Sequence, residues 1–225
     1  MDAMPFLAAM LALLPWGGAG LILILAICLI LYGAETLLDR ARLLSKRPRE
    51  SAQIATELVK DILLGIAQGF CVGRIPGAPG TYGSLVGLLW FALLIATGSY
   101  WLYLTGTICG FAFSVWCCGV AEGILKQTDP PSIVLDEIVA LPVCFLPWTA
   151  SAWFHQGTLP PPASFFGSTN LVFTSAIFVL FRIFDVLKPW PIRQSQRLPG
   201  GWGVTIDDML AATYVALLTL CFLVS

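Results

Sequence analysis

Long apolar runs, separated by short polar segments, dominate the pattern of this chain. About 20 consecutive apolar residues are enough to cross the hydrocarbon core of a bilayer. We expect a membrane-spanning helix in each of the runs that approach this length, which are residues 16–32, 84–97, 100–119, 137–154, 169–187 and 204–224. The pattern therefore predicts an all-α fold, a polytopic membrane helical bundle of about six transmembrane helices.

The segment 51–68 has a different pattern. Its apolar residues, Ile54 and Leu58 among them, recur at helical spacing, whereas Glu57 and Lys60 lie on another face. This arrangement is typical of an interfacial amphipathic helix that lies along a membrane surface.

The lysines and arginines predict how the bundle is oriented. All 12 fall in, or within one helical turn of, three segments, which are residues 35–83, 120–136 and 186–206. The other connections carry none of them, namely residues 1–15, 98–99 and 155–168. Because basic residues accumulate on the cytoplasmic side of membrane proteins, we expect these three segments in the cytoplasm and the N-terminus outside.

Composition supports a membrane protein and excludes other classes. Only 11% of the residues are charged and the mean hydropathy is +0.86, whereas a soluble domain carries about 25% charged residues. The net charge of -1 and the lack of a basic cluster interleaved with aromatic residues argue against a nucleic-acid partner. The 7 cysteines form no CxxC pair, which favours small buried apolar side chains. No pattern specifies an oligomeric state.

Acidic residues gather at three predicted span ends on the cytoplasmic side. Asp136 and Glu137 begin the fourth span, Asp185 ends the fifth, and Asp207 and Asp208 begin the sixth. Ionisable residues within spans are costly and are functional candidates. Magnesium prefers oxygen ligands and is held by one or two carboxylates together with substrate phosphate. Two alternatives remain open: each acid could simply be solvated, and acids at a helix N-terminus are also favoured by the helix dipole.

Basic and hydroxyl side chains lie near these acids in the sequence. Arg182 precedes Asp185 by three residues, so it could form an intrahelical ion pair or use its planar fork to bind a phosphate. The segment 73–84, GRIPGAPGTYGS, is too rich in glycine and proline for regular structure, and we expect a loop. Its N–H groups, with Thr81 and Ser84, could hold an anion, or these two hydroxyls could cap the next helix.

Several catalytic motifs are missing. The chain lacks the GxxxxGK[ST] spacing of a Walker A loop, a Cys-x5-Arg phosphatase loop and a DxDx[TV] motif. The one histidine, His155, lies in a connection predicted to be outside, which argues against a histidine nucleophile. A water activated by a bound metal is the mechanism that remains.

Four sequence blocks resemble the signatures of the phosphatidylglycerophosphatase A family, in the same order. They are GRIPGAPGTYGSLVGL (73–88), SIVLDEIVALPV (132–143), FRIFDVLKPWPI (181–192) and GGWGVTIDDMLAA (200–212). The resemblance implies a magnesium-dependent phosphatase of the bacterial inner membrane that converts phosphatidylglycerophosphate to phosphatidylglycerol, with its site facing the cytoplasm. It also implies a catalytic membrane domain over residues 51–225. Residues 1–50 lie outside the resemblance, and their apolar run and the basic residues after it predict an N-terminal membrane anchor and basic cytoplasmic segment.

The resemblance assigns roles to residues of this chain. It implies that the catalytic carboxylates are Asp136, Glu137, Asp185 and Asp208. The magnesium ligands would come from Asp136, Glu137, Asp207 and Asp208. The substrate phosphate would be bound by Arg74, Thr81, Ser84, Arg182 and Lys188.

Two other functions stay open at this point. A CDP-alcohol phosphatidyltransferase also uses magnesium and carboxylates, but its DG-x2-AR-x8-G-x3-D-x3-D pattern is absent. A transporter with an acidic site would show carboxylates near mid-span and internal repeats, and neither is visible.

Overall fold

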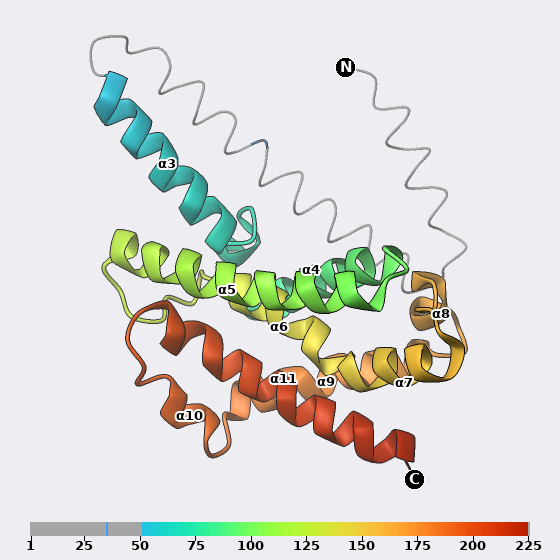
Figure 1. Ribbon diagram of the computed structural model, residues 1–225. Coiled ribbons are helices and arrows are strands. Elements are labelled where there is room, and N and C mark those ends of the chain that lie inside the picture. The colour runs from blue at the N-terminus through green and yellow to red at the C-terminus, as the bar shows by residue number, and fades with distance from the viewer. Residues whose placement is uncertain (1–34, 36–50, 225) are drawn as a thin grey trace.

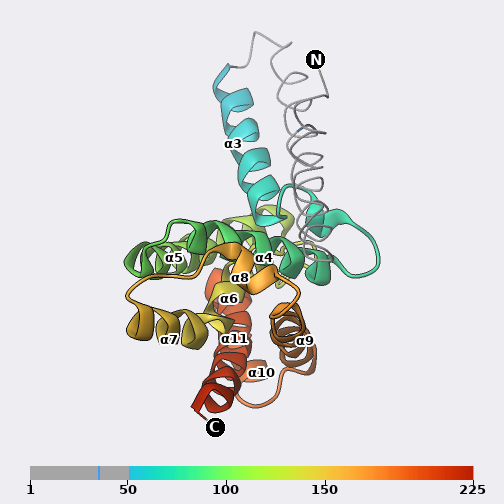
Figure 2. The ribbon, with the colours of Figure 1, turned by 90° about the vertical axis from the view of Figure 1, so that its right-hand side faces the viewer.

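The computed structural model of the protein describes residue 35 and residues 51–224. The secondary-structure elements in these residues are all helices and include no strand, which confirms the all-α prediction. The helices are α3 (Ser51–Ala67), η2 (Val72–Arg74), α4 (Pro79–Ala96), α5 (Tyr100–Leu125), α6 (Leu135–Cys144), α7 (Leu146–Gln156), α8 (Pro162–Phe166), α9 (Leu171–Leu187), α10 (Ile192–Ser195) and α11 (Gly201–Val224). Figures 1 and 2 show α3 leaving the rest of the bundle at a steep angle.

The short helix α6 lies at the centre of the bundle. It packs against α4, α5, α9 and α11 (Figures 1 and 2), and all its residues except Val143 are buried. Two of the buried residues, Asp136 and Glu137, are in its first turn. Burial of α6 on every side therefore brings two acids into the interior of the bundle.

A bend at Phe145 divides the predicted span 137–154 into α6 and α7, whose axes differ by 40°. Pro147, in the first turn of α7, explains the break, because it has no N–H to donate to the carbonyl of Val143 in the preceding turn. The carbonyl of Pro142 accepts hydrogen bonds from the backbone N–H of Phe145 and from the hydroxyl of the fully buried Tyr103. The polar groups exposed by the bend are thus partly satisfied inside the bundle.

The number of spans is smaller than predicted within the described residues. Three helices, α4, α5 and α11, are long and apolar enough to cross a membrane, and the bent pair α6–α7 makes a fourth if it is one span. Helix α9 covers the predicted span 169–187 but has only 17 residues. The predicted span 16–32 lies outside the described residues. The count of six spans is therefore not confirmed.

The glycine-rich segment 73–84 is a loop only in part, whereas we expected a loop over its whole length. Helix α4 begins at Pro79, and proline suits the first position of a helix because the N–H that it lacks has no partner there. Thr81 and Ser84 therefore lie inside the helix, and the residue at the N-cap is Ala78, which makes no side-chain cap. The alternative that either hydroxyl caps the helix is wrong.

Close packing of α5 against α11 depends on Gly201. A Cβ at this position would overlap the backbone carbonyl of Val115, which cannot move without shifting α5. We expect Gly201→Ala to lower the free energy of unfolding by about 1–3 kcal/mol, the usual cost of overpacking. Gly123→Ala is the control, because a Cβ at Gly123 meets nothing within 4 Å. Equal stability of the two purified variants in denaturant titrations would contradict this account.

Candidate active site

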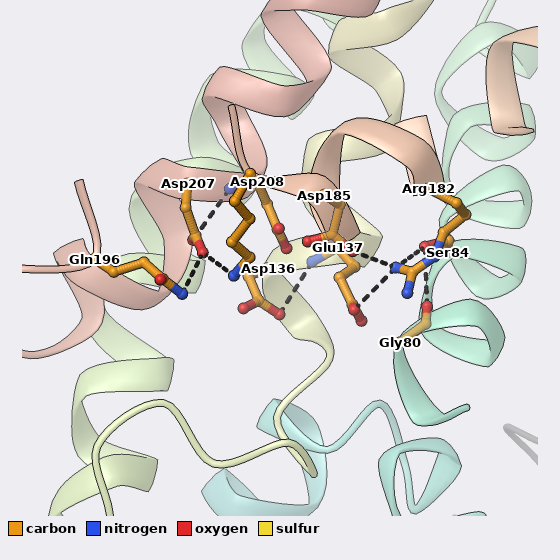
Figure 3. Close-up of polar contacts among 10 residues, drawn as sticks. Gly80, Ser84, Asp136, Glu137, Arg182, Asp185, Gln196, Asp207 and Asp208 are labelled. Carbon is orange, nitrogen blue, oxygen red and sulfur yellow. Dashed lines mark hydrogen bonds and ion pairs between the residues drawn. The ribbon is translucent and has the colours of Figure 1, made fainter. Parts of the chain in front are cut away.

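Three helices carry the five acidic side chains to one place (Figure 3). The five residues, each only 2% to 9% exposed, are Asp136 and Glu137 of α6, Asp185 of α9, and Asp207 and Asp208 of α11. Buried carboxylates are costly unless they are paired or bind a metal. Their convergence therefore marks the candidate site.

The helix dipole does not explain Asp207 and Asp208. Helix α11 begins at Gly201, earlier than predicted, so both acids lie in its second turn and its first turn has no acid. The stabilisation of anions by the helix dipole falls off within the first turn. The alternative that these two residues only stabilise a helix N-terminus is therefore wrong.

Arg182 connects the acids to α4. One of its guanidinium nitrogens, Nη1, lies 2.7 Å from Asp185 Oδ2 and 3.2 Å from Glu137 Oε1. The same nitrogen donates to Ser84 Oγ at 3.2 Å, and Ser84 in turn donates to the carbonyl of Gly80 at 2.9 Å. The intrahelical ion pair considered from the sequence is thus present, and it extends to a second carboxylate and a hydroxyl.

Two glycines of α4 make room for the Glu137 carboxylate. A Cβ at Gly80 would overlap Glu137 Oε1, and a Cβ at Gly83 would come within 2.5 Å of Glu137 Oε2. Gly80 and Gly83 share one face of the helix because they are three residues apart. Glycine at both positions therefore allows α4 to approach the acid closely.

We expect Gly80→Ala to impair the site more than the fold. The new methyl group displaces the Glu137 carboxylate and its partner Arg182, both of which end in movable side-chain atoms. Misplacement of reacting groups by about 1 Å can cost about 10²-fold in rate, so phosphate release should fall at least about tenfold. The thermal midpoint should stay close to that of wild type. If circular-dichroism melts showed that the variant unfolds at a much lower temperature, its loss of activity would reflect the lost fold, and this interpretation would be contradicted.

Lys188 and Gln196 contact the acids from the other side. Lys188 follows the last turn of α9 in the left-handed conformation, with φ of 43°, and donates to Asp207 Oδ2. Gln196 Nε2 donates to the same oxygen at 3.1 Å. Burial alone would lower the pKa of Lys188, but the hydrogen bond and charge of Asp207, with the charges of Asp208 and Asp129, raise that pKa above its ordinary value.

The site has an excess of negative charge. The ion pairs of the described residues place two cations, Arg182 and Lys188, beside the five carboxylates. In that part of the chain, Glu137 Oε2 is buried with no hydrogen-bond partner. The carboxylate of Asp208 likewise accepts no hydrogen bond from a described residue. These oxygens therefore accept no hydrogen bond from the described protein groups.

The fit to magnesium depends on the number of protein ligands required. No group of three or more acidic, histidine or cysteine side chains among the described residues is arranged to hold one ion. Magnesium, however, keeps several waters and needs only one or two carboxylates together with substrate phosphate. The unpaired oxygens of Glu137 and Asp208 match this mode of binding.

Two of the proposed phosphate-binding residues are apart from the network. Arg74 donates from Nε to Gln68 Oε1 at 2.6 Å, and no ion pair of Arg74 with an acid occurs among the described residues. Thr81 lies in the first turns of α4 without a side-chain hydrogen bond to a described residue. The structure thus groups Ser84, Arg182 and Lys188 with the acids.

The sequence analysis did not identify Gly80, Gly83 or Gln196. The spacing of the two glycines could have indicated a helix face that accepts a close neighbour, had a helix been expected there. For Gln196 no comparable signal exists, because both of its partners are distant in the sequence.

Comparisons with known proteins agree with the sequence blocks. The family model described as phosphatidylglycerophosphatase A matches residues 65–223. A phosphatidylglycerophosphatase A from Haemophilus influenzae is 33% identical over 68% of this chain and 83% of its own length. Another from Escherichia coli is 31% identical over 67% of this chain and 77% of its own length. A putative phosphatidylinositol-3-phosphatase from Bacteroides thetaiotaomicron is 31% identical over 66% of this chain and 86% of its own length.

No solved structure matches the chain. The family match covers α4 to α11 and all five acids, so it includes the whole candidate site. The family named by this match is one of phosphatases, which favours that function over the phosphatidyltransferase and the transporter. With its four sequence blocks, its buried acidic site and this match, the chain belongs to the phosphatidylglycerophosphatase A family of phosphatases.

Proposed function

We propose that the protein is a magnesium-dependent membrane phosphatase that hydrolyses phosphatidylglycerophosphate to phosphatidylglycerol and phosphate. The observation that carries the proposal is the buried carboxylate cluster held beside Arg182, in a chain similar to proteins named phosphatidylglycerophosphatase A. Carboxylates without enough cations suit a divalent metal, and the guanidinium fork suits the phosphate that the metal would share.

Two roles are proposed for the acids, and three of the acids take part in both. Glu137, Asp208 and Asp136 would supply magnesium ligands, with Asp207 as a further candidate. When bound, the ion would neutralise phosphate charge and make water a stronger nucleophile. The proposed catalytic carboxylates would orient the attacking water and accept its proton, a role that suits a carboxylate. They are Asp136, Glu137, Asp185 and Asp208.

Arg182 and Ser84 would bind the phosphate during the reaction. The water oxygen forms a bond to phosphorus, the bond from phosphorus to the glycerol oxygen breaks, and that oxygen takes up a proton. Arg182 then stabilises the negative charge of the phosphate oxygens, as a fixed cation in a site of low dielectric does. Lys188 adds a second positive charge from the far side of the cluster, and Thr81 and Arg74 are candidates for outer contacts of the lipid headgroup.

The hydrolysis is tested directly with purified protein and phosphatidylglycerophosphate in mixed micelles. We expect phosphate release with magnesium and its loss with a chelator, and recovery when magnesium is added back. Phosphatidylinositol 3-phosphate is the comparison substrate, because one relative is named a putative phosphatidylinositol-3-phosphatase. A preference for that lipid would replace the proposed substrate, and full activity in the chelator would remove the proposed metal.

The proposed setting is the bacterial inner membrane, crossed six times, with the N-terminus outside and the site facing the cytoplasm. Apolar side chains on the outer side of α9 support its placement against lipid although the helix is short, and the most exposed of them are Val172, Val179, Val186 and Leu187. A reporter fused after Gly157 should be outside and one after Gln194 inside. Reporters on the same side would contradict this topology.

A further inference from the structure

Gln196 joins the acidic cluster to a distant loop. Its Nε2 donates to Asp207 Oδ2, a contact drawn in Figure 3, and to Asp129 Oδ2. The two distances are 3.1 Å and 3.0 Å. An ionised carboxylate can only accept hydrogen bonds, and the amide nitrogen has two donors. Both donors are therefore used, and the two acidic neighbours determine which end of the amide faces them.

Asp207 differs from Asp208 in how its oxygens are used. Its Oδ1 accepts the backbone N–H of Asp208 at 3.1 Å, and its Oδ2 accepts both Lys188 and Gln196. The residue is only 2% exposed, so its orientation is fixed by these contacts. Both oxygens of Asp207 thus accept hydrogen bonds from protein groups, whereas the carboxylate of Asp208 has no such partner among the described residues.

The other partner, Asp129, belongs to the loop between α5 and α6. The backbone N–H of Asp129 donates to Glu122 Oε1 at 2.8 Å, which attaches the loop to the end of α5. The same loop leads into α6, whose first turn carries Asp136 and Glu137. The amide of Gln196 therefore connects α11 with the segment that precedes the other acid pair.

We propose that Gln196 is a positioning residue, which holds Asp207, and through Asp207 the ammonium group of Lys188, beside the acidic cluster. The effect on turnover rests on the proposed function. Without the amide, Asp207 and Asp129 face each other with no donor between them, and like charges repel. The side chain of Lys188 is 25% exposed, so it can then follow a displaced Asp207 toward solvent.

The first test measures phosphate release by Gln196→Ala at saturating magnesium. We expect kcat to fall about tenfold, which is a loss of about 1.4 kcal/mol of transition-state stabilisation, with KM within about twofold. Because Gln196 acts through Lys188, Gln196→Ala should cause little further loss in a Lys188→Ala background, as expected for coupled residues. Losses that multiply in the double variant would overturn the proposal.

Two matched variants separate positioning from a general effect on the loop. Gln194→Ala changes an exposed glutamine of α10, the short helix that Gln196 directly follows, and should retain wild-type kcat. Asp129→Asn keeps an oxygen acceptor for Gln196 and should stay within about twofold of wild type. If Gln194→Ala lost as much activity as Gln196→Ala, or if Gln196→Ala kept full kcat, Gln196 would not be a positioning residue.

A second test does not depend on the substrate. Thermal unfolding of Gln196→Ala, Asp207→Ala and the double variant measures whether the two side chains act together, since alanine removes the acceptor that Gln196 uses. We expect the double variant to unfold at the midpoint of the less stable single variant, because either change removes the same bond. Additive shifts in the midpoint would refute the contact. If the wild-type protein released no phosphate from the lipid, the proposed function would fail while this measurement still decided the role of Gln196 toward Asp207.

Discussion

Replacing Glu137 by Gln, or Asp208 by Asn, should lower the rate of phosphate release at least about 10²-fold, equivalent to about 2.7 kcal/mol. An amide keeps the size of the side chain and an oxygen acceptor but removes one negative charge. The oxygens concerned are those that protein groups leave free, since Glu137 Oε2 is buried without a partner among the described residues. Charge lost there weakens the binding of a cation in a site of low dielectric, where electrostatic effects are strong.

Both amide variants should still fold, because a neutral amide is easier to bury than a carboxylate. The measurement is phosphate release by the purified variants across a magnesium titration, together with their thermal midpoints. Glu57→Gln is the matched control, since Glu57 is exposed on α3 and pairs only with Lys60 among the described residues. Wild-type rates in both variants at limiting magnesium would exclude these carboxylates as ligands.

Removing Arg182 should have an effect of similar size for a different reason. Arg182→Ala deletes the cation that lies within 3.2 Å of Glu137 and Asp185, and with it the donor to Ser84. Loss of one donor that stabilises transition-state charge typically costs about 10²–10³-fold in kcat. We expect a decrease in this range, together with a lower unfolding midpoint, because two buried carboxylates are left without their partner.

Arg182→Lys separates charge from geometry. A lysine retains the positive charge but has a single nitrogen in place of the planar fork, so it should recover stability more than activity. Arg193→Lys on α10, where the side chain is exposed, should be close to wild type in both measurements. Full activity in Arg182→Lys would show that a positive charge alone is sufficient at this position.

The fold class and the candidate acids follow from local features of the sequence. Apolar runs of near-spanning length predicted helices that the structure contains as α4, α5 and α11. The acids were recognised because charged residues are rare in a chain with 11% charged residues, so those at span ends are conspicuous. Pro147, in contrast, was not interpreted as a helix break, because a proline within an apolar run also occurs in helices that continue past a kink.

Helix boundaries in the glycine-rich segment were mispredicted for a physical reason. The composition of 73–84 indicates a loop when its residues are considered alone, since glycine is unfavourable in helices by up to about 1 kcal/mol. In the folded protein, Gly80 and Gly83 lie against Glu137, and that close packing is available only to glycine. Tertiary contact thus explains why glycines that are unfavourable in helices occupy the first turns of α4.

The sequence by itself determined that this protein is helical and belongs to a known family of phosphatases, because the apolar runs and the four signature blocks are continuous along the chain. Only the tertiary structure decided which acid has which neighbours. Arg182 contacts Glu137 across 45 residues of sequence, and Gln196 contacts Asp129 across 67. Such pairs depend on how α6, α9 and α11 pack together, and helix packing is a property of all their side chains rather than of any local pattern.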